Sequence, residues 1–367
     1  METRLIIKTH TECLRPALFS TMILKCTSPT QSAYPEKVAA DLSDILSEKG
    51  ISGRTEERKA AAKFAVYIAH RHLKLLGAKM TWDWRGHALA AILEKTGKTR
   101  DTDPQELNQL CPEERFIFLK YFLEADGGVI CGLSKVLAQY GKVTNQMMYD
   151  HIEEIFSRIY DAYLSLASDF RERMQVKAQL RGIKKQIKGE SRKRSTLPHK
   201  VLPHMQALVD LGVLHEAKDR GTYEPVQCAD HSSVAPLGEL FDHLDEFEKV
   251  FSEGNPYRLI AAIYGLSARD ASFDTDWNAV TSTIMNGYAL LQDPTTATAH
   301  ISALADWTCV SLLAERRLLI SPHGVNEALE ELARREPSSV RFHVDYRGEP
   351  AYVILARGYE ESVAMDE

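Results

Sequence analysis

The densest run of positive charge in this chain lies at residues 171–200. It holds eleven Lys/Arg and two Glu, a local charge of +9, whereas the 367-residue chain carries −6 and its other residues therefore −15. Charged side chains are almost never buried without a partner, so this run has to face either solvent or a polyanion. Clustered cations also displace the counterions that condense on nucleic-acid phosphates. The run therefore favours a nucleic-acid partner.

The composition is that of a folded globular protein. Apolar residues make up 44% of the chain and charged residues 26%, which argues against wholesale disorder. The length allows about two to four domains. No apolar run reaches the roughly 18 residues that a membrane span needs, so no membrane partner is expected. The six cysteines are scattered without a CxxC pair, which favours reduced thiols and a cytoplasmic location.

Apolar residues at helical spacing predict a mainly α-helical protein. One helix is expected over residues 54–76, with an apolar stripe that includes Tyr67 and Leu75. A second begins at Pro112, where two glutamates follow in the first turn, and it is apolar almost all round, which indicates deep burial. The turn-forming residues 126–128 are expected to end it. A third long helix is expected to start with Thr144 or Asn145 as its cap.

Two parts of the chain share the order helix, turn, helix and then a two-strand hairpin. The first ends at residues 197–226 and the second at residues 319–355. Both resemble the winged-helix module, a helix-turn-helix with a β-hairpin wing, over about 170–226 and 302–357. Residues 105–165 are a candidate for a third, degenerate copy. We therefore predict a mainly α fold with two such modules, or three if that copy is counted.

The expected domain organisation follows these patterns. A polar, proline-bearing linker near residue 103 marks the first boundary. The expected parts are an N-terminal helical domain at 1–103, a helical region at 104–168, a basic helix with a winged-helix-like module at 169–232, and a helical region that ends in the second module at 233–367.

The resemblance implies that residues at the start of a recognition helix reach base edges, while flanking cations hold phosphates. The candidate DNA-binding residues are Lys184, Lys185, Lys188, Arg192, Lys193, Arg194, Ser195, Thr196, His199, Lys200 and, at the hairpin tip, Arg220. A solvated basic helix face with no ligand is the alternative interpretation of the same residues.

The second module differs in charge. Its expected recognition helix carries Glu327, Glu330 and Glu331 beside Arg334 and Arg335. Acidic side chains there would repel phosphates, so protein contacts are the better interpretation of this module.

Patterns that carry catalysis or metal binding are weak in this sequence. Cys228 and His231 form one close pair, whereas a structural zinc site usually needs two. No GxxxxGK[ST] or GxGxxG motif occurs. Asp345 and Glu349 are the nearest candidates for a nuclease site, but no lysine accompanies them. We therefore expect no cofactor, no metal and no catalytic residue.

The leading hypothesis is a non-enzymatic, cytoplasmic protein that binds double-stranded DNA through its basic helix and recognition-helix segment. Its preference for DNA over RNA and its existence as a homodimer stay open. The first alternative is an adaptor subunit that docks on a helicase, nuclease or ATPase in a bacterial DNA-processing or anti-phage (antiviral) defence complex. The second alternative is a nucleic-acid enzyme of unrecognised type.

Overall fold

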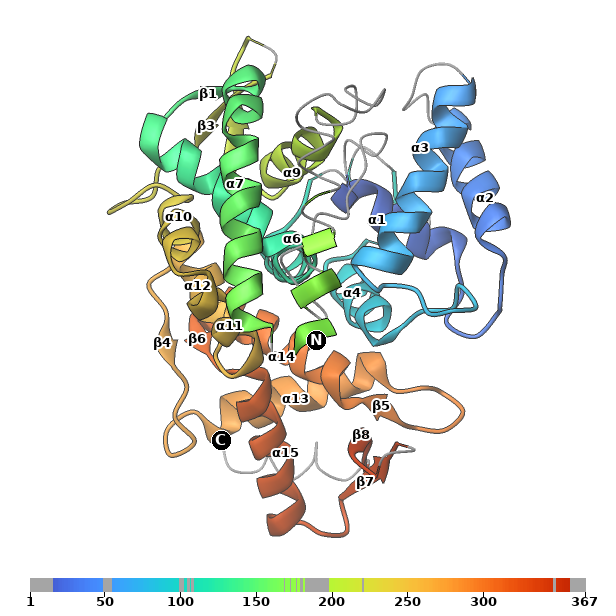
Figure 1. Ribbon diagram of the computed structural model, residues 1–367. Coiled ribbons are helices and arrows are strands. Elements are labelled where there is room, and N and C mark those ends of the chain that lie inside the picture. Colours follow the sequence, from blue (N-terminus) through green and yellow to red (C-terminus); the bar gives the residue numbers. More distant parts are fainter. Residues whose placement is uncertain are drawn as a thin grey trace.

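The protein is mainly α-helical, with three small sheets among the residues that the structure describes. The structure is a computed structural model (Figure 1). It describes residues 16–48, 55–98, 102–103, 106, 109–167, 169–171, 173–175, 177–178, 181, 198–219, 221–345 and 348–356. Buried apolar side chains from the first helix to the last strand form one contiguous core. The predicted class, mainly α with small strands, is confirmed.

The N-terminal part of the fold is helical throughout its regular elements. These are α1 (Pro16–Cys26), α2 (Pro35–Glu48), α3 (Thr55–Tyr67), the π-helix η1 (Ile68–His72) and α4 (Trp84–Lys95). α2 and α3 pack side by side at one edge of the molecule (Figure 1). The apolar side of α2, which includes Val38, Leu42 and Leu46, faces the core.

The helix expected over residues 54–76 is not regular along its length. α3 ends at Tyr67 and continues as the wide turn η1, and the backbone of Lys74 then has a positive φ of 54°. π-helical turns occur frequently at functional sites. Tyr67, expected on the apolar stripe, is 49% exposed instead. The stripe therefore turns partly toward solvent where the helix widens.

The longest helix, α6 (Pro112–Tyr140), lies at the centre of the fold (Figure 1). Pro112 occupies its first position, and Cys111 and Glu114 satisfy its first amides as a capping box. Nearly every side chain from Phe116 to Leu123 is buried, as its all-round apolar pattern predicts. It packs against α4, α7 (Asn145–Leu166), α10 (Ala235–Asp242), α12 (Pro256–Ile263) and α14 (Ile301–Arg316).

The expected end of this helix at residues 126–128 is wrong. Asp126 leaves the helical region, with φ −138° and ψ 33°, but the helix resumes at once and continues to Tyr140, with Gly141 as its C-cap. The glycine at 127 is needed for packing, because a Cβ there would lie 2.0 Å from the ring of Phe247. The Asp126 carboxylate lies 3.1 Å from Nε2 of His204, and both groups are buried. Residues 126–128 therefore make a kink rather than a stop.

The first three-stranded sheet joins segments on both sides of the basic run. The elements are β1 (Val143–Thr144), α7 (Asn145–Leu166), α9 (Pro198–Asp210), β2 (Leu214–Glu216) and β3 (Thr222–Pro225). The sheet is antiparallel with the order β1-β3-β2. The Thr144 hydroxyl caps α7 by accepting a hydrogen bond from the amide of Met147. The predicted cap is confirmed.

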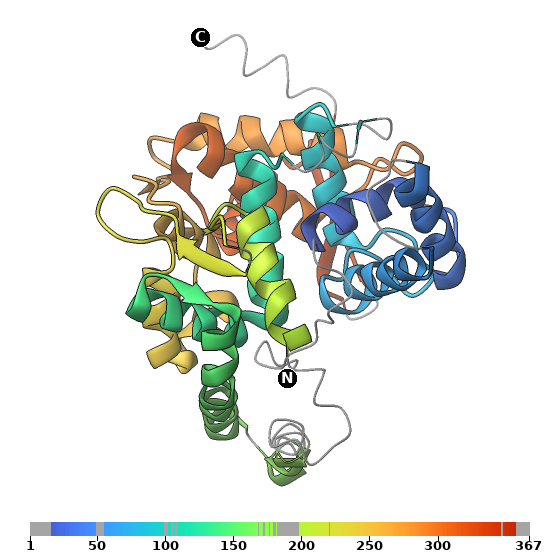
Figure 2. The same ribbon diagram turned by 90° about the horizontal axis from the view of Figure 1, so that it is seen from above.

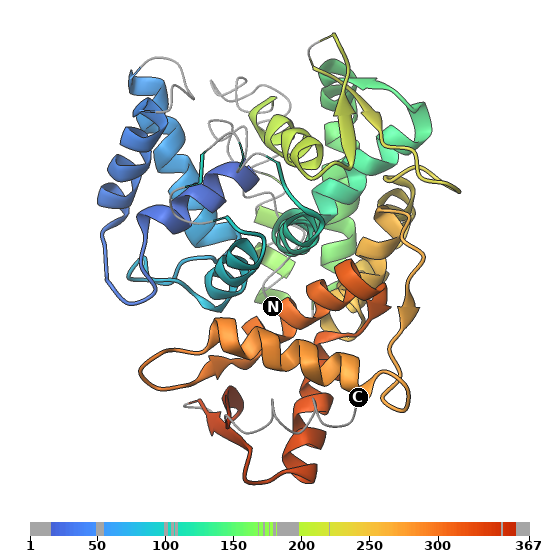
Figure 3. The same cartoon turned by 180° about the vertical axis from the view of Figure 1, so that it is seen from behind.

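A second antiparallel sheet repeats this order near the C-terminus. The elements are α13 (Trp277–Leu291), β5 (Ala299–His300), α14 (Ile301–Arg316), α15 (Pro322–Arg335), β7 (Val340–Val344) and β8 (Pro350–Leu355), and the strand order is β5-β8-β7. Figure 3 shows α15 and the β7–β8 hairpin together at one end of the molecule. The hairpin expected from the alternating residues here is confirmed.

Shorter elements connect the two sheets. α10 (Ala235–Asp242), α11 (Leu244–Ser252) and α12 (Pro256–Ile263) follow the first sheet, and α10 packs closely along α6. β4 (Arg269–Asp270) follows them and pairs in parallel with β6 (Leu318–Leu319), which comes after α14.

Two findings bear on the expected organisation. The boundary expected near residue 168 crosses the first sheet, because β1 precedes it and β2 and β3 follow it. No helix in the described ranges is both long enough and apolar enough to span a bilayer.

Candidate functional site

Most of the predicted DNA-binding residues lie outside the described residues. These are Lys184, Lys185, Lys188, Arg192, Lys193, Arg194, Ser195, Thr196 and Arg220. His199 and Lys200 fall in the first turn of α9, where only the backbone is described. These DNA-binding residues therefore remain predictions, and the case for binding rests on the described residues on either side of them.

The basic run begins in a described helical stretch after α7. Arg171, Arg173, Lys177 and Arg181 are helical and exposed, and Figure 2 shows this stretch apart from the body of the molecule. Arg173 donates a hydrogen bond from Nε to the carbonyl of Ala167. Within the described part of the chain, no ion pair with a carboxylate involves any of these four cations. Their charges are therefore available to a ligand.

Two large apolar side chains lie among these cations. Phe170 is 79% exposed and Met174 is 48% exposed, one helical turn apart. Proteins that bind single-stranded nucleic acid place aromatic rings among cations in this way, and the bases stack on the rings. Binding of single strands is therefore compared with binding of duplex DNA below.

α9 follows the basic run and is mostly buried. None of its side chains from Val201 to Asp210 is exposed, and His204 and Met205 lie fully inside. The helix packs against α1 and α7. Residues 201–210 therefore offer little surface to a ligand, whereas the first turn of α9 holds the last residues of the basic run.

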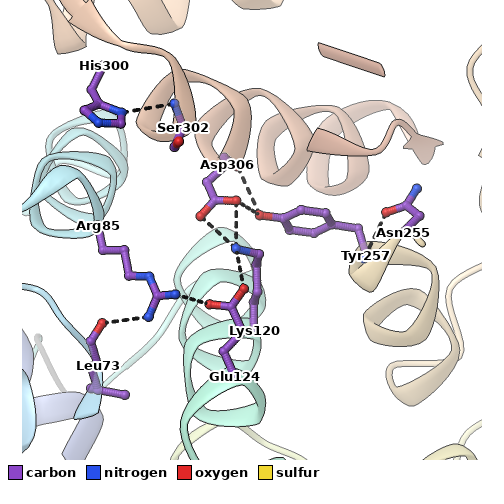
Figure 4. Close-up of polar contacts among 9 residues, drawn as sticks. All are labelled: Leu73, Arg85, Lys120, Glu124, Asn255, Tyr257, His300, Ser302 and Asp306. Carbon is purple, nitrogen blue, oxygen red and sulfur yellow. Dashed lines mark hydrogen bonds and ion pairs between the residues drawn. The ribbon is translucent and has the colours of Figure 1, made fainter. Parts of the chain in front are cut away.

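A second candidate site is a buried cluster of charged groups around Lys120 on α6 (Figure 4). The Lys120 ammonium lies 3.0 Å from Asp306 of α14 and 3.1 Å from Glu124 one turn along α6. Arg85 of α4 lies 2.6 Å from Glu124. Tyr257 of α12 donates its hydroxyl hydrogen to Asp306 at 2.9 Å. The cluster thus joins four helices that are distant in sequence.

The charges in this cluster compensate one another. Lys120 and Asp306 have side chains only 5% and 3% exposed. Burial lowers the pKa of Lys120, but Asp306 and Glu124 outweigh burial, and its pKa is raised above the ordinary lysine value. Burial, followed by the charge of Asp306, raises the pKa of Tyr257 as well. Lys120 is therefore a permanent cation and is unsuited to act as a base or nucleophile.

Aromatic rings surround the same cations. Lys120 lies 5.8 Å and Arg85 5.1 Å from the ring centre of Trp84, and both also approach Tyr121. Cation–π contacts of this kind stabilise desolvated cations. Trp84 is therefore occupied within the fold rather than free to stack on a base.

A pocket of about 420 Å³ opens beside the cluster where α4, α12, α14 and α15 begin. Helix starts attract anions through their free amides. Here each helix already has its own cap: Asp83, Asn255, His300 and Ser321 accept hydrogen bonds from first-turn amides. The cluster and its pocket are therefore best explained as a structural junction.

The cysteine–histidine pair considered for zinc has partners inside the fold. Cys228 donates to the carbonyl of Ile263, and His231 bonds to the carbonyl of Ala262. No group of three or more His, Cys, Asp or Glu side chains within the described residues is placed to hold a metal ion.

Comparison with protein-family models, with curated proteins and with solved structures finds no match to this chain. The geometry and the charges described above therefore carry the functional argument.

Proposed function

We propose that this protein binds nucleic acid, with duplex DNA as the expected ligand, through the basic run at residues 171–200. The observation that carries the proposal is the set of exposed cations at the start of this run. These cations have no carboxylate partner within the described residues, although the rest of the chain carries a net charge of −15. Cations that no carboxylate neutralises are free to displace counterions from phosphates.

The element order supports two winged-helix-like modules, and the first of them contains this run. In each module a helix is followed by a short strand, two further helices and a β-hairpin. The short strand and the hairpin form an antiparallel sheet in which the last strand of the hairpin lies in the middle. Most of the basic run lies between α7 and α9, the two helices that precede the hairpin of the first module. Its last residues, 198–200, form the first turn of α9.

A charge-reversal experiment tests the proposal. We expect Arg192→Glu, Lys193→Glu and Arg194→Glu together to weaken binding of a fluorescent duplex of about 20 base pairs by at least about tenfold, because phosphate contacts supply most nonspecific affinity. Fluorescence anisotropy at a fixed salt concentration measures the affinity, with single-stranded DNA and RNA as competitors.

The matched control reverses three exposed lysines outside the run, Lys37, Lys63 and Lys79, and so changes the net charge equally. We expect this control to retain wild-type affinity to within about threefold, because distant surface charges are screened. Equal losses in both triple variants, or no loss in either, would contradict the siting of the interface.

The second candidate function is that of an adaptor, and the surface of α15 favours it. Glu327 and Glu330 are exposed, and Glu331 lies 2.6 Å from Arg334 and 2.8 Å from Arg335. Both arginines of this helix thus share the Glu331 carboxylate, while Glu327 and Glu330 face solvent. We infer that the second module contacts protein rather than phosphate, and the protein partner is expected to be a DNA-processing enzyme.

A further inference from the structure

A groove of about 640 Å³ runs between α2 and α3 at the edge of the molecule. Its apolar floor combines the small side chains of Ala39 and Ala40 of α2 with the larger Val66 of α3 and Met80 of the following loop. Small residues allow another helix to approach closely, as in other tightly packed helix pairs. The floor therefore suits a helix better than it suits a compact ligand.

The two walls of the groove carry opposite charge. Glu36 and Asp44 line it from α2, and Lys63 and Arg71 line it from α3 and η1. In each pair the residues are eight positions apart, which is roughly 12 Å along a helix. The groove thus has an acidic rim and a basic rim of matched length, with Tyr67 midway along the basic one.

The charges of the two rims do not neutralise each other. Glu36, Asp44, Lys63 and Arg71 are all exposed. Among the residues that the structure describes, no ion pair connects one rim to the other, although Lys59 nearby does pair with Glu56 at 3.3 Å. Rim charges that do not pair with each other are available to complement charges on a partner protein.

We propose that this groove binds an amphipathic helix of a partner protein. The helix presents small apolar residues to the floor, acidic side chains to Lys63 and Arg71, and basic side chains to Glu36 and Asp44. This is the helix-in-groove mode of recognition, in which apolar anchors give affinity and flanking charges give specificity. None of the residues that line the groove belongs to the basic run, so the proposal does not rest on nucleic-acid binding.

The signs of the two rims also fix the direction of the bound helix. Turning a helix end for end exchanges its flanks, so only one direction places its acidic flank against Lys63 and Arg71. The same logic sets partner orientation in coiled coils through their flanking charges.

Three synthetic helical peptides of about 20 residues test the proposal by fluorescence anisotropy. All share an alanine–leucine stripe. One carries glutamates on one flank and lysines on the other, the second carries glutamates on both flanks, and the third carries lysines on both. We expect the full-length protein to bind the mixed peptide about tenfold more tightly than either of the others, because each of those faces one like-charged rim.

The Lys63→Glu/Arg71→Glu variant makes both rims acidic and should reverse this ranking, so that the peptide with lysines on both flanks binds best. The matched control, Lys37→Glu/Lys79→Glu, alters exposed lysines that do not line the groove and should keep the wild-type ranking. Circular dichroism confirms that both variants fold.

Three results would overturn the proposal. The first is that no peptide binds, and the second is that the ranking is the same in wild type and in Lys63→Glu/Arg71→Glu. The third is a wild-type dimer, seen by sedimentation, that this variant dissociates, because a second copy of the chain would then be the occupant. Loss of DNA binding alone leaves the peptide ranking unaffected, so the two proposals fail separately.

Discussion

At the scale of single residues, Lys120 shows how a charge is kept inside this fold. The sequence places it in a helix that is apolar almost all round, which signals a buried partner. Its main partner, Asp306, lies 186 positions away, and no local pattern connects the two. The existence of a buried ion pair was therefore predictable in principle, whereas the identity of the partner depends on how α6 and α14 pack.

The Asp306→Asn variant should lose about 3 kcal/mol of unfolding free energy, because Lys120 then keeps only Glu124, which Arg85 already shares. Urea unfolding followed by circular dichroism measures the loss.

The double variant Lys120→Met/Asp306→Leu is the control for this interpretation. It removes both charges at similar volume and leaves the Arg85–Glu124 pair in place, so it should be more stable than Asp306→Asn. If the unfolding free energy of Asp306→Asn lies within about 0.5 kcal/mol of the wild-type value, the Lys120–Asp306 pair is not a structural junction.

At the scale of elements, short local patterns predict where helices begin, whereas the course of a helix through the core depends on long-range packing. Thr144 and Ser321 cap α7 and α15 as their sequences predict, because a cap depends on only a few neighbouring residues. The sequence predicts a turn at Gly127, whereas the structure keeps this residue inside α6. Its small size accommodates Phe247, a residue 120 positions later, and such a contact leaves no local signature.

Gly127→Ala should therefore destabilise the protein by about 1–3 kcal/mol, because the added methyl group overlaps the buried Phe247 ring. In an unconstrained helix the same change would stabilise by roughly 1 kcal/mol. Chemical denaturation of Gly127→Ala, Phe247→Leu and the double variant gives the coupling. We expect the double variant to recover part of the loss, and simple additivity of the two single effects would refute the packing argument.

At the scale of the whole molecule, the sequence predicted the mainly helical class and the hairpin at residues 340–355, and the structure has both. It did not predict that β1 pairs with β3 across the basic run, because β1 has only two residues and its pairing is long-range. The groove between α2 and α3 was missed as well, since its two rims lie on separate helices. The basic run was recognised from charge alone and remains the centre of the functional proposal.

The salt dependence of duplex binding tests that proposal most directly. Binding of one duplex is measured from about 50 to 200 mM salt for the wild-type protein and for the Arg192→Glu/Lys193→Glu/Arg194→Glu variant. The account predicts that the logarithm of affinity falls linearly with the logarithm of salt concentration in the wild type, and that the slope is shallower by about three in the variant. A wild-type affinity that does not change with salt, or equal slopes in the two proteins, would contradict it.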